Sequence, residues 1–348
     1  MAEISDAAVA APPKRSFFVR RVEAMVQFEV FFVSAVATII FVRAILAATG
    51  WPQLGGGKIH FAHLLWGGLG MLIAIILFLA LEGRLWTTLG ALAAGIGFGL
   101  FIDELGKFIT SDNDYFFRPA IAIIYVVFVA LFFLFRWLGS IKHLSPQTAL
   151  VNAFDFAKEA VLRDMDEGER TEALYLLSRS DQADPVVIAL GDMLRSLEMP
   201  EKPNPSPLAT ASRWLSALYG RLVGRHWFRV LVVGWFVVIS LAGLLGGLSV
   251  FLDPANVTFV EAGLTITGLL VGALVVIGIV RGRHSHLVAY TWFERAVLVS
   301  ILVGEFFEFY ANQLGALVGL LILLLTFITI RYMIGEEQKK QAERLAAH

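Results

Sequence analysis

Residues 119–138 read PAIAIIYVVFVALFFLFRWL and contain one charged side chain, Arg136. A helix of this length rises about 30 Å, the thickness of the hydrocarbon core of a bilayer. The stretch therefore predicts a helix that crosses a membrane. The composition of the whole chain agrees, because 57% of its residues are hydrophobic and 16% are charged, whereas roughly 25% of residues are charged in an average soluble domain.

Other stretches of similar length and composition predict the same structure, so we expect an all-α polytopic membrane protein with about eight transmembrane helices. The first stretch is too long for the core of a signal peptide and follows Arg20, Arg21 and Glu23, so we expect it to be retained. The expected spans are 26–48, 60–81, 85–109, 119–138, 227–252, 259–280, 291–311 and 314–334.

The positions of lysine and arginine predict the orientation, because basic residues tend to stay on the cytoplasmic side of a membrane. The loops on the opposite side carry only Lys58 and Arg118. We therefore expect a multi-pass protein of the cell membrane with both termini in the cytoplasm. The basic residues on the cytoplasmic side are Lys14, Arg15, Arg20, Arg21, Arg84, Arg281, Arg283, Lys339, Lys340 and Arg344.

The two halves of the chain resemble each other when they are aligned, which indicates an internal repeat. With an even number of spans in each half, the pattern predicts two parallel four-helix repeats related by an axis along the membrane normal. Transporters commonly place their binding site between such repeats. The matching pairs include Phe61 and Phe259, His63 and Glu261, Gly70 and Gly268, Glu104 and Glu305, and Phe108 and Phe309.

A polar stretch at about 143–224 separates the halves and predicts a small cytoplasmic helical insert. Ser145 and Asp184 each precede a proline, which is a typical helix start. We expect insert helices at 146–165, 167–178 and 185–197, a proline-rich linker at 199–207 and an amphipathic helix at 208–222. The expected domains are a cytoplasmic N-terminal segment (1–25), the first repeat (26–140), the insert and linker (141–226), the second repeat (227–334) and a cytoplasmic tail (335–348).

Ionisable side chains lie within or at the ends of the apolar spans, where a charge costs several kcal/mol and commonly has a function. In residues 101–117, FIDELGKFITSDNDYFF, Asp103 and Lys107 are four apart and could form a structural ion pair. That pair leaves Glu104, which aligns with Glu305, unexplained. We expect an ion-binding site or a proton relay in these spans. For Glu305 and Glu308, contact with the outer interface of the membrane is the alternative. The residues expected in the ion-binding site or proton relay are Glu104, Glu305, Asp103, Lys107, Glu261 and Glu308.

His60 and His63 are three residues apart, so both imidazoles can project from one side of a helix start. The pair is compatible with a metal site and equally with two anchors at the membrane interface. Together with the carboxylates, it would suit Zn²⁺, Mn²⁺ or Fe²⁺. The chain has no cysteine, which excludes disulfides and thiolate ligands.

These features favour an integral membrane transporter or channel for a small cation. The cation would be a divalent metal ion, or its transport would be coupled to protons. An intramembrane metal-dependent hydrolase acting on lipid is one alternative, and whether the protein is an enzyme stays open. A membrane scaffold whose insert (143–224) binds a cytoplasmic protein is another. Expected partners are the bilayer, the cation or proton and a second copy in a homo-oligomer. The net charge of -1 provides no basic field for nucleic acid.

Overall fold

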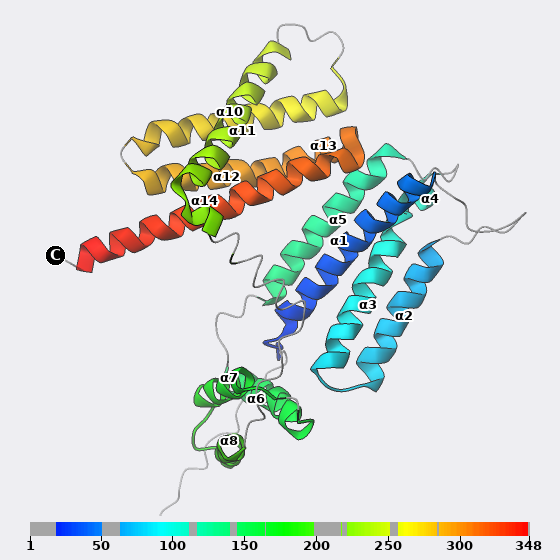
Figure 1. Ribbon diagram of the computed structural model, residues 1–348, viewed down its shortest axis with the longest axis vertical. Helices are drawn as coiled ribbons and strands as arrows, with labels where there is room; N and C mark the ends of the chain where they lie inside the picture. The colour runs from blue at the N-terminus through cyan, green and yellow to red at the C-terminus, as the bar shows by residue number, and fades with distance from the viewer. Residues whose placement is uncertain are drawn as a thin grey trace, which may run out of the picture. The chain divides into compact units, whose positions relative to one another are not determined.

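The computed structural model describes residues 19–50, 63–110, 117–139, 145–163, 165–197, 217, 221–250, 257–283 and 285–346. All regular secondary structure in these residues is helical (Figure 1). By length and composition, seven helical stretches in this part of the chain can cross a membrane. The class expected from hydropathy, a helical membrane protein, agrees with both observations.

The predicted spans match helices whose ends differ from the prediction by a few residues. The largest differences are that residues 85–109 form two helices rather than one and that the last helix continues well past 334. The helices of the first half are α1 (Ala24–Thr49), α2 (His63–Ala80), α3 (Arg84–Asp103), α4 (Leu105–Ile109) and α5 (Arg118–Gly139). Those of the second half are α10 (His226–Val250), α11 (Phe259–Gly282), α12 (His286–Val299), α13 (Glu305–Asn312) and α14 (Ala316–Ala346).

The seventh apolar stretch, His286–Lys339, folds back on itself. It is 54 residues long, far more than the roughly 20 that span a bilayer. The reversal occurs at Gln313, whose φ of 48° is uncommon for a residue with a side chain. α12 and α14 pack against each other and lie side by side in Figure 1. The stretch therefore has two arms that run in opposite directions.

The chain divides into two compact units. Unit 1 comprises Met1–Leu100 and Phe132–Pro203, and unit 2 comprises Phe101–Leu131 and Asn204–His348. Unit 2 therefore contains the end of α3, α4 and the first part of α5 in addition to α10 and the helices that follow it. For this reason the first-half residues Asp103 and Glu104 belong to the same unit as Glu305.

Glycines bring the helices of unit 1 close together. A Cβ at Gly97 of α3 would lie 2.6 Å from the Met71 nitrogen and 2.7 Å from the Gly67 oxygen of α2. These distances leave no space for a side chain, because both neighbours are backbone atoms. The end of α5 packs against α1, where the rings of Phe28 and Phe135 stack with centroids 4.3 Å apart.

The insert contains α6 (Pro146–Val161), α7 (Glu167–Ser178) and α8 (Pro185–Ser196). Both predicted starts are confirmed: Ser145 Oγ accepts a hydrogen bond from the Thr148 amide at 3.1 Å, and Asp184 Oδ1 accepts one from the Val186 amide at 2.8 Å. The three helices share an apolar core around buried leucines such as Leu176. Most of the predicted linker and amphipathic helix lies outside the described residues.

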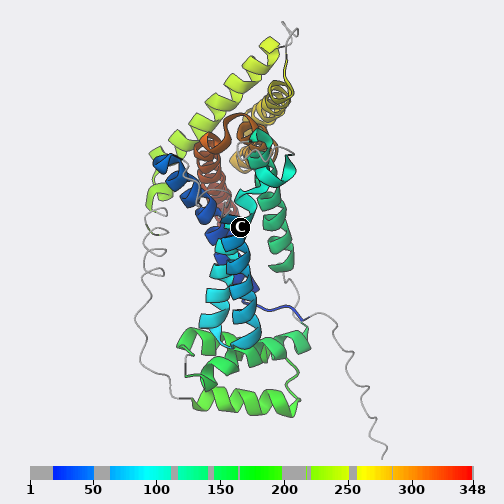
Figure 2. The ribbon, with the colours of Figure 1, turned by 90° about the vertical axis from the view of Figure 1, so that its right-hand side faces the viewer.

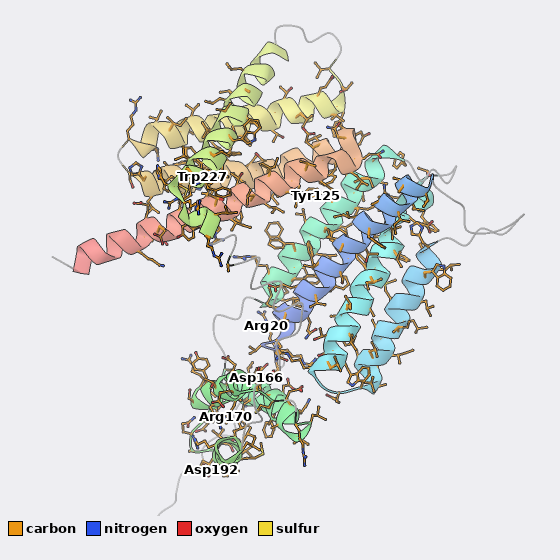
Figure 3. All side chains as sticks on the ribbon, viewed as in Figure 1. Arg20, Tyr125, Asp166, Arg170, Asp192 and Trp227 are labelled. Carbon is orange, nitrogen blue, oxygen red and sulfur yellow. The ribbon has the colours of Figure 1, made fainter. Side chains whose placement is uncertain are left out.

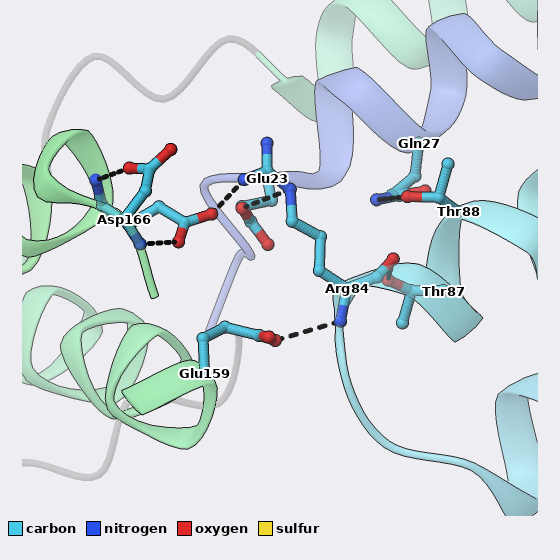
Figure 4. A network of polar contacts seen from close by, with 8 residues as sticks. Glu23, Gln27, Arg84, Thr87, Thr88, Glu159 and Asp166 are labelled. Carbon is cyan, nitrogen blue, oxygen red and sulfur yellow. Dashed lines mark hydrogen bonds and ion pairs between the residues drawn. The ribbon is translucent and has the colours of Figure 1, made fainter. Parts of the chain in front are cut away.

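Polar contacts attach the insert to the membrane helices of unit 1. Figure 2 shows α6, α7 and α8 lying across the ends of α2 and α3. Arg84, the first residue of α3, is the centre of these contacts (Figure 4). Its backbone nitrogen donates to Glu159 Oε1 of α6 at 3.0 Å, and its guanidinium pairs with Glu169 of α7 and, at 3.8 Å, with Glu23.

Two ionisable groups at this junction respond to their surroundings. Burial raises the pKa of Glu23, with Arg84 opposing the shift. The hydrogen bond between Lys158 and Asp155 raises the pKa of the lysine.

The side chain of Asn152 also bridges α6 to the segment before α1, accepting from the Val22 amide at 2.7 Å and donating to the Arg20 carbonyl at 2.9 Å. The insert is therefore a docked part of unit 1.

Candidate ion-binding site

The helix that carries Glu305 widens immediately before this residue. Residues Ser300–Gly304 form one turn of π-helix between α12 and α13, and the Glu305 amide donates to the carbonyl of Ser300, five residues earlier. Such widened turns are rare and often lie at functional sites, because they displace backbone groups from the regular helical pattern. The turn places Glu305 at the start of α13.

A cavity of about 450 Å³ lies beside this turn in unit 2. Side chains from α10, α11, the π-helix, α13 and α14 line it. Along α14 its wall extends from Ala316 to Thr326, a rise of about 15 Å, or roughly half the hydrocarbon thickness of a bilayer. The cavity thus begins near the turn at Gln313 and reaches deep along the helices.

Glu305 is the buried acid of this cavity. Its side chain lines the wall, and only 3% of the residue is exposed. Its Oε2 atom is buried and has no hydrogen-bond partner among the described residues. Leaving a buried carboxylate oxygen unpaired is costly. An atom of this kind therefore indicates a ligand or a proton that is part of the working protein.

Tyr125 of α5 connects the first half of the chain to this helix. Its hydroxyl donates to the carbonyl of Ile301 inside the π-helix, and its ring stacks on Phe309 of α13 with centroids 4.9 Å apart. Figure 3 labels Tyr125 on α5. The tyrosine hydroxyl also interacts electrostatically with Glu305. A first-half residue thus supports the turn that positions the acid.

Hydroxyl groups form much of the remaining polar lining of the cavity. Four helical segments supply one hydroxyl group each. They are Ser240 from α10, Thr267 from α11, Ser300 from the π-helix and Thr326 from α14. Ser240, Thr267 and Thr326 are buried. The lining contains no basic residue among those that the structure describes, so the electrostatics favour a positive ligand.

Asp103 and Glu104 are buried at the break between α3 and α4, with exposures of 1% and 0%. Both have interactions with neighbouring groups. Neither of them lines the cavity beside Glu305. The side chain of Lys107 lies outside what the structure describes, so its predicted ion pair with Asp103 stays a prediction.

The other predicted residues occupy three different settings. Glu308, one turn after Glu305, lines the same cavity, and its Oε2 accepts a hydrogen bond from Asn312 Nδ2 at 2.8 Å. Glu261 caps its own helix, because its Oε2 accepts from the Thr258 amide at 2.9 Å. The T-x-x-E pattern at 258–261 could have predicted this capping role. The structure therefore brings Glu305 and Glu308 together at the cavity and gives Glu261 a separate structural contact.

His63 is the half-buried first residue of α2, and His60 lies outside the described residues. In the part of the chain that is described, three or more histidine, aspartate or glutamate side chains are nowhere grouped so as to hold a metal ion. The metal site at His60 and His63 stays a prediction.

Local sequence patterns do not predict the positions of two residues at the site. Tyr125 and Thr326 resemble ordinary members of apolar spans, and no local pattern separates them from their neighbours.

Comparison with protein-family models, with curated proteins and with solved structures found no match. The function must therefore be argued from the geometry of the cavity and from the residues around it.

Proposed function

We propose that the protein is an integral membrane transporter or channel for a small cation and that Glu305 is its central acid. The observation that carries the proposal is a buried carboxylate oxygen, unpaired among the described residues, in the wall of a cavity between apolar helices. Ionisable residues inside membrane helices commonly mark ion or proton pathways. The absence of basic groups from the described lining supports a cation rather than an anion.

The proposal includes eight transmembrane spans, with α12 and α13 forming the seventh and α14 the eighth. The reversal at Gln313 and the packing of α12 on α14 support two crossings by the 54-residue stretch. An even number of crossings would put both termini on one side, and the basic residues at both ends favour the cytoplasm.

The proposal also includes two parallel repeats. The sequence spacing between the starts of α1 and α3, Ala24 and Arg84, equals that between the starts of α10 and α12, His226 and His286. In each half, the third long helix is interrupted at the aligned glutamate, Glu104 or Glu305. Both observations support a duplicated four-helix bundle in which the acids share an ancestral position.

Ion flux into proteoliposomes tests the proposal. The full chain is reconstituted, and uptake of protons, Na⁺ and Mn²⁺ is followed with ion-sensitive dyes or isotopes. We expect Glu305→Gln to reduce the flux of the transported ion by about tenfold or more, because the neutral amide cannot offset a cation in a low-dielectric cavity.

Glu294→Gln is the matched control. Glu294 lies on α12, pairs with Arg331 at 3.6 Å and is not part of the cavity wall. Its flux should stay within about twofold of the unchanged protein, because a partly exposed ion pair contributes little. If Glu305→Gln inserts as a monodisperse protein and transports as well as Glu294→Gln, Glu305 is not the central acid.

A further inference from the structure

We propose that the cavity beside Glu305 binds a monovalent alkali cation of the size of Na⁺ through oxygen atoms. The inference names the ion class of the proposed transport site and therefore rests on the proposed function. It is carried by the chemistry of the hydroxyl groups in the wall, by their distribution over the bundle and by the charge of the site.

Three of the four hydroxyl groups in the wall already use their protons within the helices. Thr267 Oγ1 donates to the Gly263 carbonyl at 2.8 Å, Thr326 Oγ1 donates to the Ile322 carbonyl at 2.8 Å, and Ser300 Oγ donates to the Ala296 carbonyl at 3.2 Å. A hydroxyl has one proton and two lone pairs. With the proton committed, each oxygen can offer only lone pairs to a ligand. An oxygen that offers only lone pairs can coordinate a cation but cannot donate a hydrogen bond to an anion.

The same bonds argue against a chain of hydroxyls that relays protons. Each member of such a chain must donate its proton onward while it accepts another. Thr267 and Thr326 would first have to break their bonds to their own helices, at a cost of about 1 kcal/mol or more each. A metal cation uses the lone pairs without disturbing these bonds.

The lining also selects the chemical class of the cation. The described lining offers carboxylate and hydroxyl oxygens and no histidine. Hard cations such as the alkali and alkaline-earth ions prefer oxygen ligands, whereas zinc and iron favour sites with nitrogen or sulfur. The wall therefore fits a hard cation.

The charge of the site favours a monovalent ion. Glu305 is buried and has an unpaired oxygen, whereas Glu308 is only half-buried and accepts a hydrogen bond from Asn312. One fully buried carboxylate neutralises one positive charge. A divalent ion would leave an uncompensated charge in the low-dielectric interior, which is costly.

The geometry of the bundle supplies ligands from several directions. Ser240, Thr267, Ser300 and Thr326 come from four different helical segments. Glycines at 243, 268 and 319 also line the cavity, so the wall has little side-chain bulk between these oxygens. A small cation in this cavity thus has hydroxyl oxygens on several sides.

Stabilisation by salts tests this inference on the full purified chain in detergent. Thermal unfolding is followed while NaCl replaces choline chloride at constant ionic strength. An ion that binds only the folded state raises the unfolding temperature with a saturable dependence. We expect this response with Na⁺, a weaker one with K⁺ and none with choline.

Two buried threonines provide the variant and its control. Thr267→Val should raise the Na⁺ concentration at half-effect by about tenfold, because Thr267 lies beside Gly304, the residue before Glu305. Glu305→Gln should abolish the response. Thr329→Val should match the unchanged protein. Thr329 is also buried and donates to its own helix at 2.8 Å, but it is not part of the wall.

The outcomes separate the two proposals. Equal responses to Na⁺ and choline, or equal shifts in Thr267→Val and Thr329→Val, overturn the alkali-ion site. If proton flux in proteoliposomes still depends on Glu305, the proposed function stands without the alkali-ion site. A Na⁺ response that requires Glu305 and Thr267, in a protein that carries no ion across the membrane, supports the site and overturns transport.

Discussion

The third long helix of each half is interrupted at a buried glutamate, but the two interruptions differ in kind. At Glu104, α3 ends and the short α4 begins, with φ and ψ of -86° and 9° at the glutamate. At Glu305, the helix continues through a widened turn. The second glutamate lines a cavity and has an unpaired oxygen, whereas the first has an interaction partner and lies outside that cavity.

The glycines around the two interruptions show a related difference. In unit 1, Gly97 of α3 contacts the backbone of α2 so closely that no side chain would fit. In unit 2, Gly243, Gly268 and Gly319 line the cavity. Glycine thus lies at a backbone contact in the first bundle and in a cavity wall in the second. Aligned residues in a repeat need not share one role.

Substitution of the two glutamates should separate their roles most clearly. Glu104→Gln is expected to lower the free energy of unfolding by about 2–4 kcal/mol, because Glu104 is fully buried and the amide would weaken its interaction with a neighbouring group. Glu305→Gln should change this free energy by less than about 1 kcal/mol, since its Oε2 has no described partner to lose. Unfolding in mixed micelles, titrated with denaturing detergent, measures both. Equal losses would contradict the difference between the two sites.

The tight packing of unit 1 predicts the next largest effect. Gly97→Ala should destabilise the protein by about 1–3 kcal/mol, because the new methyl group would overlap backbone atoms of α2. Gly234→Ala on α10 is the control, since a Cβ there meets nothing within 4 Å. It should stabilise α10 by up to about 1 kcal/mol, as expected from helix propensity. The same unfolding titration measures both variants. If both change the free energy of unfolding in the same direction, the close contact at Gly97 is contradicted.

Loss of the Tyr125 hydroxyl should have a smaller and more local effect. Tyr125→Phe removes the hydrogen bond to the Ile301 carbonyl but keeps the ring that stacks on Phe309. We expect a loss of about 1 kcal/mol and faster amide hydrogen exchange confined to residues 300–309. Tyr175→Phe, on the exposed surface of α7, should leave this exchange unchanged. Faster exchange throughout both units would indicate a global rather than a local role.

The pH dependence of the insert junction should be the smallest effect, and it concerns a feature that only the first half has. Burial raises the pKa of Glu23 above its ordinary value of 4.5. The folded state therefore binds this proton more tightly than the unfolded state, and stability falls as the pH rises from 4.5 through the raised pKa. The thermal midpoint of the purified protein should fall across this window, and Glu23→Gln should make that fall shallower. An identical slope in the variant would assign the pH dependence to other groups.

The features that sequence analysis predicted well are local ones. The apolar runs depend only on composition over about 20 residues, so the helices from α1 to α14 lie close to their expected positions. Ser145 and Asp184 cap their helices as predicted because a capping side chain bonds amides two or three residues away. The interruption at Glu104 was not predicted, since the apolar pattern continues across it.

The sequence by itself determined the membrane class, the approximate spans, the insert helices and the presence of acids in apolar segments. Only the tertiary structure decided that Glu305 and Glu308 line a cavity. Only the tertiary structure also brought Tyr125 to the Ile301 carbonyl. Hydropathy and caps arise from neighbours in the chain, whereas a cavity depends on which faces of distant helices meet. A single sequence carries no local signal for that choice.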